Sequence, residues 1–319
     1  MHPDAAAWFA RRTSAWTDWT IPALQEAKGS TRVSVVLPAL DEEPTVGEIV
    51  AGIVKLRDAT GLVDEIFVID SGSEDDTAAV AAAAGATVRH RDDILPEYGS
   101  QPGKGEVLWK ALAVTTGDIL VYVDADLTDF RQTFVTGLLG PLLTDPSVRL
   151  VKAFYDRPLL DSSPAGGGRV TELAARPLLN AYFPELAGVV QPLAGEYAAR
   201  RSLLSSLPFA AGYGVETGLL IDTVREYGLD AVAQVDLGAR THGHQDTAAL
   251  GRMSATILAT VLARATPDHP LWSTLTQFRR DAEGRIEPVT QPTRWPERPP
   301  MQTVLRPHPP SPSTDRPSA

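Results

Sequence analysis

The chain has 319 residues, a formal net charge of −11, a sequence pI of about 5.0 and 22% charged residues, as expected of a soluble globular protein with one or two domains. It has no cysteine, which excludes disulfides, cysteine-ligated metal centres and thiol catalysis, and fits a reducing cytoplasm. The acidic balance argues against a nucleic-acid-binding protein. No apolar run approaches the roughly 20 residues of a membrane span, and no signal peptide is evident.

The first half of the chain alternates strands with helices. Residues 1–31 mix tryptophans with charged residues and are predicted to form a short helix or extended arm that packs on the domain. Continuous apolar runs then predict strands at Val33–Leu40, Asp64–Asp70, Ala86–His90 and Ile119–Val123. Apolar residues at helical spacing predict helices at Glu43–Leu56, Thr77–Ala84 and Gly105–Val114. This alternation predicts an α/β fold with a mostly parallel central sheet flanked by helices.

The second half is less regular. Helices are predicted at Phe134–Leu143, Val170–Ala181, Val215–Tyr227 and Leu250–Ala265, and strands at Val148–Tyr155, Glu196–Arg200 and Ala231–Leu237. The last helix is strongly apolar and could be core or a subunit interface. From about Gln291 prolines dominate, and the stretches Pro296–Pro300 and Pro307–Pro312 are predicted to be a tail that builds no packed core.

Acidic residues follow three predicted strands. Asp124 and Asp126 come directly after the central strand, Asp70 and Ser71 end the second, and Asp41 follows the first. Carboxyl ends of parallel strands share one edge of a sheet, where ligands bind. Carboxylates there suit Mg²⁺ or Mn²⁺ holding a phosphate. Each motif alone could be a helix cap, but together they suit a nucleotide. Neither Gly-x-Gly-x-x-Gly nor a P-loop is present.

Four further motifs could bind anions, metal or sugar. Lys104 lies between two glycines at a predicted helix start, where amide groups and the helix dipole favour phosphate. Three glycines precede Arg169 and Thr171, a second candidate anion site. His242 could ligate a metal, and Glu216 could accept sugar hydroxyls or act as an acid or base. A surface turn, a linker, a structural histidine and a helix cap are the respective non-functional alternatives.

Together these motifs resemble the GT-A nucleotide-sugar glycosyltransferases, and more closely the actinobacterial glucosyl-3-phosphoglycerate synthases. The matching stretches span nearly the whole chain: residues 33–43, 70–76, 102–106, 124–127, 166–173, 191–197, 212–223, 237–242 and 298–301. Asp-x-Asp alone indicates only a metal-dependent nucleotide-sugar transferase. The runs Gly-Gly-Gly-Arg-Val-Thr-Glu-Leu and Pro-Phe-Ala-Ala-Gly-Tyr-Gly-Val-Glu make the resemblance specific.

The resemblance implies transfer of glucose from UDP-glucose, or GDP-glucose, to the 2-hydroxyl of 3-phosphoglycerate with retention at the anomeric carbon. This transfer would give glucosyl-3-phosphoglycerate, and it would be the first step towards methylglucose lipopolysaccharide or glucosylglycerate. The cofactor would be Mg²⁺ or Mn²⁺, and the enzyme would be a cytoplasmic homodimer. Residues 1–31 would be an N-terminal arm, 32–155 the nucleotide-sugar-binding half, 156–290 the acceptor-binding and dimerisation half, and 291–319 a proline-rich tail.

Site residues follow from the same resemblance. The donor would be bound by Pro38, Ala39, Leu40, Glu42, Ser71, Lys104, Asp124, Ala125, Leu193, Tyr213, Glu216 and Arg240. The acceptor would be bound by Gly168, Arg169, Val170 and Thr171, and the metal by Asp126 and His242. The catalytic group would comprise Asp126, Glu216, Lys104 and Arg240. The chain departs from the family at Ala125, often serine there, and at Gly243 and His244, where arginine and asparagine are frequent.

The expected mechanism is front-face substitution, in which the β-phosphate of the donor accepts the acceptor's proton. A covalent intermediate on Glu216 is the rival. Three other functions compete with the main one. These are transfer of mannose, transfer to a polyprenyl phosphate, and a nucleotide-sugar-binding regulator without turnover. Intact Asp126, Lys104, Arg169 and His242 argue against the last.

Overall fold

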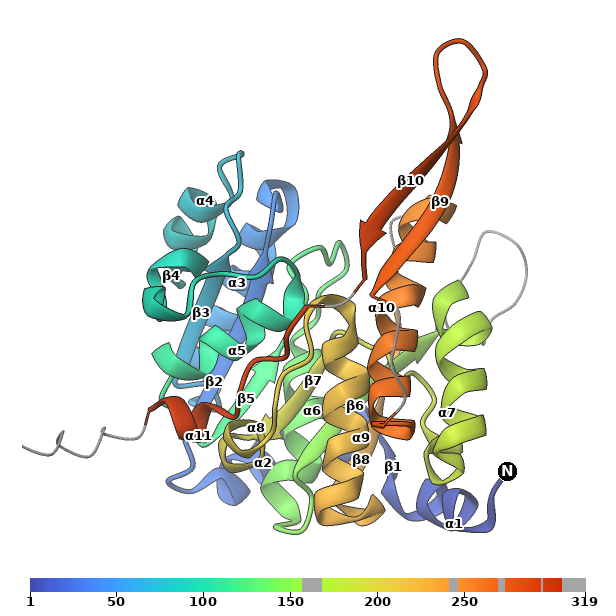
Figure 1. Ribbon diagram of the computed structural model, residues 1–319. Helices are drawn as coiled ribbons and strands as arrows, with labels where there is room; N and C mark the ends of the chain where they lie inside the picture. Colours follow the sequence, from blue (N-terminus) through green and yellow to red (C-terminus); the bar gives the residue numbers. More distant parts are fainter. Residues whose placement is uncertain (157–167, 241–245, 269–272, 294, 306–319) are drawn as a thin grey trace, which may run out of the picture.

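A computed structural model describes residues 1–156, 168–240, 246–268, 273–293 and 295–305. Its centre is an eight-stranded sheet with the strand order β1-β8-β6-β7-β5-β2-β3-β4 (Figure 1). The strands are β1 (Thr13–Ala15), β2 (Val33–Ala39), β3 (Glu65–Asp70), β4 (Thr87–His90), β5 (Ile119–Tyr122), β6 (Leu150–Asp156), β7 (Tyr197–Arg200) and β8 (Val232–Ala239). Only β7 runs antiparallel to its neighbours among these strands, which confirms the predicted mostly parallel α/β fold.

Helices cover both faces of the sheet. They are α1 (Pro3–Arg12), α2 (Ile21–Lys28), α3 (Glu43–Thr60), α4 (Thr77–Ala83), α5 (Lys104–Val114), α6 (Gln132–Thr144), α7 (Arg176–Tyr182), α8 (Arg201–Ser206), α9 (Val215–Tyr227), α10 (Thr247–Ala265) and α11 (Met301–Val304). The predicted strands and helices are therefore present, with ends that shift by a few residues. Within the described part of the chain, no helix is both long and apolar enough to span a bilayer.

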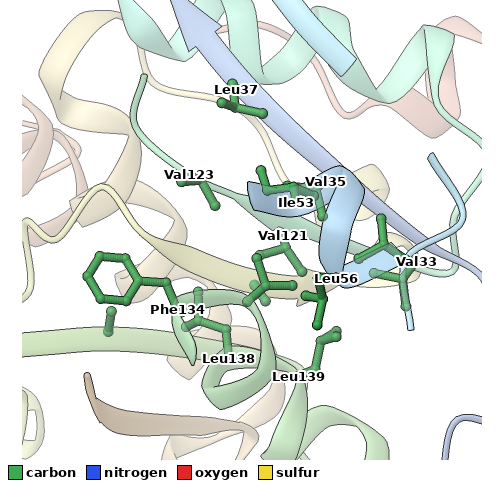
Figure 2. Close-up of a cluster of buried hydrophobic side chains, with 14 of the residues drawn as sticks. Val33, Val35, Leu37, Ile53, Leu56, Val121, Val123, Phe134, Leu138 and Leu139 are labelled. Atoms are coloured by element: carbon green, nitrogen blue, oxygen red, sulfur yellow. The ribbon is translucent and has the colours of Figure 1, made fainter. Parts of the chain in front are cut away.

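The apolar run of β5 is buried because alternate side chains enter two different cores. Val121 and Val123 pack with α3 and α6 on one face, as Figure 2 shows. Leu120 and Tyr122 belong to the second core, on the face covered by α5 and α9. Successive residues of a strand point to opposite faces, so a strand buried on both needs a continuous apolar sequence. This arrangement fixes the end of β5, where Asp124 and Asp126 emerge.

The N-terminal arm is both helix and strand. α1 places Trp8 in the core, fully buried, where its indole Nε1 donates to the carbonyl of Val232 at 2.8 Å. β1 then pairs in parallel with β8 and forms one edge of the main sheet. This pairing could not be predicted, because Thr-Ser-Ala has no apolar pattern typical of a strand.

A two-stranded hairpin, β9 (Thr274–Arg280) and β10 (Ile286–Pro292), projects from the body at the N-terminal end of α10 (Figure 1). The sequence did not predict it, since most of its side chains are exposed, including Phe278 at 71%. α10 itself buries Ile257 and Val261 in the second core but leaves Leu258 exposed. One face of this helix is therefore core, and the other is open.

The segment that precedes α11 packs on the body along α5 (Figure 1). Residue 298 pairs with Phe209 as an isolated antiparallel bridge, Trp109 Nε1 donates to the carbonyl of Pro299 at 2.8 Å, and Met301 is buried. The prediction that Pro296–Pro300 builds no packed structure is wrong. Prolines lack the amide N–H, so an extended stretch rich in them can be covered without leaving donors unpaired.

Candidate active site

The site begins where β5 ends. Asp124 has 22% of its side chain exposed and Asp126 has 56%, so the first carboxylate faces the protein and the second faces outwards. Asp124 lies against the backbone of Gly195, where a Cβ atom would overlap the carboxylate. Glycine at 195 thus allows the segment before β7 to approach Asp124 closely. The role of this glycine was not predicted from the sequence.

Lys104 occupies the first residue of α5 and points at the end of β5. Its ammonium forms a short ion pair with Asp124 and lies 3.2 Å from Glu216 Oε1, at the start of α9. Burial alone would lower the pKa of Lys104, but the charges of Asp124 and Glu216 outweigh burial and raise it. Burial likewise disfavours ionised Asp124, yet Lys104 and Arg240 hold its pKa at about 2. Three of the predicted site residues are therefore in direct contact.

Arg240 follows β8 and reaches the same cluster from the other side. Its guanidinium is 4% exposed and donates from Nη1 to both oxygens of Glu196, at 2.7 and 2.8 Å. Nη1 also donates to Tyr155 Oη at 2.7 Å, and Nη2 donates to Asp126 Oδ1 at 3.0 Å. The guanidinium is thus fixed by the fully buried Glu196 and turns one edge towards the strand-end carboxylates.

The open side of the cluster carries a surplus of negative charge. Burial, and then the charge of Asp124, raise the pKa of Asp126. Burial and the charge of Asp126 raise the pKa of Glu42 to about 7. Thr45 Oγ1 donates to the carbonyl of Ala125 at 2.6 Å and so joins the start of α3 to this loop. A divalent cation beside Asp126 would offset the surplus, so the residues present fit one.

The described residues include no group of three His, Asp or Glu side chains that could hold a metal on their own. Mg²⁺ commonly takes one or two carboxylates and completes its shell with substrate phosphates and water. Asp126 suits that arrangement because more than half of its side chain is exposed. The predicted second ligand, His242, lies outside the described residues.

The ends of β2 and β3 are joined by hydrogen bonds into one wall. The amide of Ser71 donates to the carbonyl of Ala39 at 2.9 Å, and the amide of Asp41 donates to Ser73 Oγ at 2.9 Å. Asp41 has a positive φ of 56°, uncommon for a residue with a Cβ atom and typical of strained turns at functional sites. Leu40 is 52% exposed beside it. The predicted donor residues at these strand ends therefore lie together: Pro38, Ala39, Leu40, Glu42 and Ser71.

The predicted acceptor residues directly follow residues 157–167, which lie outside the described part of the chain, and they stand at the start of a helix. Thr171 is buried, at 3% exposure, as is Val170, whereas Arg169 is exposed. The helix opens with a π-helical turn, Thr171–Ala175, before α7 continues it. π-helical turns are rare and often occur at functional sites. Gly168 is described and half-buried; the two glycines before it are not described.

Of the remaining predicted donor residues, Glu216 contacts Lys104, whereas Tyr213 and Leu193 lie close in sequence to Glu216 and Gly195. Tyr213, 44% exposed, lies in the short turn before α9, two residues before its first residue, and Leu193 is half-buried two residues before Gly195. Glu216 is 6% exposed. An aromatic edge, an aliphatic side chain and a carboxylate of this kind suit a sugar ring.

Three residues of the cluster were not predicted from the sequence: Glu196, Tyr155 and Lys152. All three belong to apolar runs in or beside β6 and β7, which were treated only as strands. Lys152 Nζ is buried, donates to the carbonyl of Ala194 at 2.6 Å and lies 4.9 Å from the centre of the Tyr197 ring. The signal that could have found Glu196 and Lys152 is a charged residue inside a strand whose neighbours are all apolar.

Lys152 predicts a pH dependence of stability. Burial lowers its pKa to about 8, with the charge of Glu216 opposing and that of Lys104 adding. Between pH 8 and 10 the unfolded chain therefore binds a proton that the folded chain lacks, so the free energy of unfolding rises with pH. Relative to Lys152→Met, the free energy of unfolding of the wild type should rise by about 2 kcal/mol between pH 8 and 10. Urea unfolding of both proteins at several pH values measures it, and parallel curves would contradict it.

Comparison with known proteins agrees with the α/β fold described above. The sequence profile of glycosyl transferase family 2 matches residues 34–158. Glucosyl-3-phosphoglycerate synthase of Mycolicibacterium paratuberculosis is 52% identical over 309 residues, which cover 93% of this chain and 92% of that one.

Solved structures extend the comparison. Mannosyl-3-phosphoglycerate synthase from Rubrobacter xylanophilus aligns with a TM-score of 0.87 at 42% identity, covering 94% of this chain and all of that one. Glucosyl-3-phosphoglycerate synthase from Mycobacterium tuberculosis, in complex with Mn²⁺, UDP-glucose and phosphoglyceric acid, aligns with a TM-score of 0.82 at 49% identity, covering 92% and 99%. The same enzyme in complex with Mg²⁺ and UDP aligns with a TM-score of 0.84 at 50% identity, with the same coverage.

Proposed function

The chain belongs to the glucosyl-3-phosphoglycerate synthases, within glycosyl transferase family 2, and on this basis we propose how its site works. The protein is a metal-dependent glycosyltransferase that transfers glucose from UDP-glucose to 3-phosphoglycerate, with Mg²⁺ or Mn²⁺ as its cofactor. We propose the 2-hydroxyl as the acceptor position, because it is the free hydroxyl of 3-phosphoglycerate.

One observation carries the residue roles. Two cations, Lys104 and Arg240, converge on Asp124, and Arg240 also reaches the half-exposed Asp126. The carboxylates and cations alternate at the carboxyl end of a central parallel strand, where α/β folds bind ligands. A diphosphate with a divalent ion can enter such an arrangement by exchanging the internal ion pairs for its own. Pro38, Ala39, Leu40, Glu42, Ser71 and Asp124 would hold the nucleoside beside it.

The mechanism follows from where charge develops. The leaving group is a nucleoside diphosphate, and a metal on Asp126 and His242 would neutralise its growing negative charge. Lys104 and Arg240 would donate to the same oxygens. Glu216 and Glu196 would still hold these two side chains after their pairs with Asp124 and Asp126 are exchanged, so little reorganisation would be needed during the reaction. Leu193, Tyr213 and the backbone of Ala125 would border the donor, with Glu216 accepting from sugar hydroxyls.

We propose retention by front-face substitution, with the donor's β-phosphate accepting the acceptor's proton. Glu216 is paired with Lys104 at 3.2 Å, so its oxygen is already engaged, which disfavours it as a nucleophile. Mass spectrometry of the enzyme mixed with donor and no acceptor tests this. A glucosyl adduct on Glu216 would overturn the proposal in favour of the covalent route.

The acceptor site is proposed at Gly168, Arg169, Val170 and Thr171. Thr171→Ala removes a buried hydroxyl, so the KM for 3-phosphoglycerate should rise about tenfold with a smaller change in kcat, since a hydrogen bond to a charged group is worth about 1.5–3 kcal/mol. Steady-state kinetics with varied acceptor measures this, and Thr171→Ser, which keeps the hydroxyl, is the matched control. An unchanged acceptor KM in Thr171→Ala would show that the acceptor binds elsewhere.

The function is tested by product formation. The protein is mixed with UDP-glucose, Mg²⁺ and 3-phosphoglycerate, with controls that lack acceptor or contain EDTA, and the mixture is analysed by mass spectrometry. A hexosyl-phosphoglycerate mass that disappears with EDTA is the expected result. UDP release without this product would reject the acceptor.

Mannose transfer is the second candidate, because the mannosyl-3-phosphoglycerate synthase from R. xylanophilus aligns with the higher TM-score of 0.87. The same assay with GDP-glucose, GDP-mannose and UDP-mannose separates the possibilities. We expect the highest kcat/KM with UDP-glucose and propose GDP-glucose as a slower donor. Transfer to a polyprenyl phosphate is not favoured by these relatives.

We further propose a cytoplasmic homodimer. The exposed face of α10 and the projecting hairpin, with Phe278 and Ile286 exposed, offer apolar surface for a second copy. We also propose that residues 32–155 bind the nucleotide sugar and residues 156–290 the acceptor. Light scattering gives the oligomeric state, and a mass of one chain would reject the dimer.

A further inference from the structure

The two segments that carry Lys104 and Glu216 touch through bare backbone. A Cβ atom on Gly103 would lie 2.6 Å from the Cα atom of Gly212, and one on Gly105 would overlap the carbonyl of Ala210. The start of α5 therefore lies directly on the chain that leads into α9. Any shift between the two segments changes the 3.2 Å distance between Lys104 and Glu216.

Arg298 binds both segments at once. Its backbone exchanges two hydrogen bonds with Phe209, each 2.9 Å, directly before Ala210. Its guanidinium forms a bidentate pair with Glu106, at 2.6 and 2.8 Å, in the first turn of α5. It also donates to the carbonyls of Tyr98 and Gly99, at 3.0 and 3.2 Å, in the loop before Lys104. Arg298 is 9% exposed and Glu106 is 1% exposed.

We propose that Arg298 is a positioning residue for Lys104, which it fixes against Asp124 and Glu216 from the C-terminal side of the chain. The inference rests on the proposed function, in which Lys104 contacts the donor. Arg298 acts on Lys104 through Glu106, the loop at 98–99 and the backbone of Phe209, and not through the ligand. The positive charge of Arg298 matters less than the planar shape of its guanidinium, because the four directed hydrogen bonds of that group define the position of the start of α5.

The test is Arg298→Lys, which keeps the positive charge and loses the fork. We expect kcat/KM for UDP-glucose to fall about 10- to 100-fold, the affinity for UDP with Mg²⁺ to weaken in calorimetry, and the KM for 3-phosphoglycerate to stay within about twofold. The matched control is Arg201→Lys. Arg201 holds the other end of α5 through Leu112, Thr115 and Gly117, so its loss should lower Tm but leave kcat/KM within about twofold.

A double-mutant cycle separates positioning from general stabilisation. If Arg298 acts through Lys104, then Arg298→Lys should have almost no further effect on UDP affinity in a Lys104→Met background. Additive losses, or equal losses in Arg298→Lys and Arg201→Lys measured well below their Tm, would overturn the proposal. If Arg298→Lys does not fold, Glu106→Gln takes its place in the same cycle, because it weakens the same pair from the other side.

Failure of the proposed function can be distinguished from failure of the positioning role of Arg298. In that case the wild type and Arg201→Lys would form no glucosyl product either. The cycle would then be decided by UDP binding alone, which needs the nucleotide site but not the acceptor.

Discussion

Asp126→Ala should abolish metal-dependent glucose transfer, lowering kcat by at least about 1000-fold. Asp126 is the outward-facing carboxylate of the cluster, more than half exposed, and the group best placed to meet a metal bound to the donor diphosphate. Without it, Arg240 keeps its bonds to Glu196, so the cations would remain but the metal would lose its proposed ligand Asp126. The measurement is the initial rate with Mg²⁺ or Mn²⁺ at about 1 to 20 equivalents of the UDP-glucose present.

Two further measurements show whether the lost activity of Asp126→Ala comes from the metal site. Asp126→Asn keeps the size and an oxygen, so it should retain Tm within a degree or two and bind Mn²⁺–UDP more weakly than the wild type in calorimetry. Residual turnover above about one tenth of the wild-type rate in Asp126→Ala would place the metal elsewhere.

Glu196→Gln should lower kcat about 100-fold and the free energy of unfolding by about 3 kcal/mol. Glu196 is fully buried and accepts two hydrogen bonds from Arg240, and it is the group that turns the guanidinium towards Asp124 and Asp126. A glutamine can accept at only one of these positions and leaves a buried cation with less compensation. Arg240 should then be held less firmly in this orientation and stabilise the leaving diphosphate less well.

The matched control for this change is Glu65→Gln. Glu65 lies at the amino end of β3, opposite the site, where it accepts from Ser34 Oγ at 2.6 Å and from the amide of Thr116 at 2.9 Å. It should lose stability but keep kcat. Chemical denaturation and steady-state kinetics on both variants give the comparison. If Glu196→Gln lowers the free energy of unfolding but leaves kcat unchanged, Arg240 does not depend on Glu196 for its position.

The sequence predicted the parts of the site that are encoded locally. Asp124 and Asp126 follow an apolar run, and Lys104 precedes a helix between glycines; each pattern lies within about ten residues, and the structure brings Lys104, Asp124 and Glu216 into contact. The residue roles carried over from the family came from motifs of similar length. The strand order, with β7 antiparallel between β5 and β6, was beyond such patterns.

What was missed depends on partners far away in the chain. Trp8 meets Val232 across 224 residues, and Arg298 meets Glu106 across 192. Neither residue carries a local signal of its partner, and the prolines around Arg298 suggested a tail. Glu196 was missed for a related reason. Its neighbours indicate a buried strand, and only the position of Arg240 in space explains a carboxylate there.

The short strand β1 has a consequence for how the molecule is made. It covers the outer edge of β8, and its Thr13 lies opposite Gln234, so a segment from early in the chain completes an edge formed by a strand more than 200 residues later. Contacts this distant in sequence form late and slowly during folding. Until β1 docks, β8 presents unpaired amide and carbonyl groups that another chain could pair with. Between completion of β8 and docking of β1, this edge is therefore open to pairing with another chain, which favours aggregation.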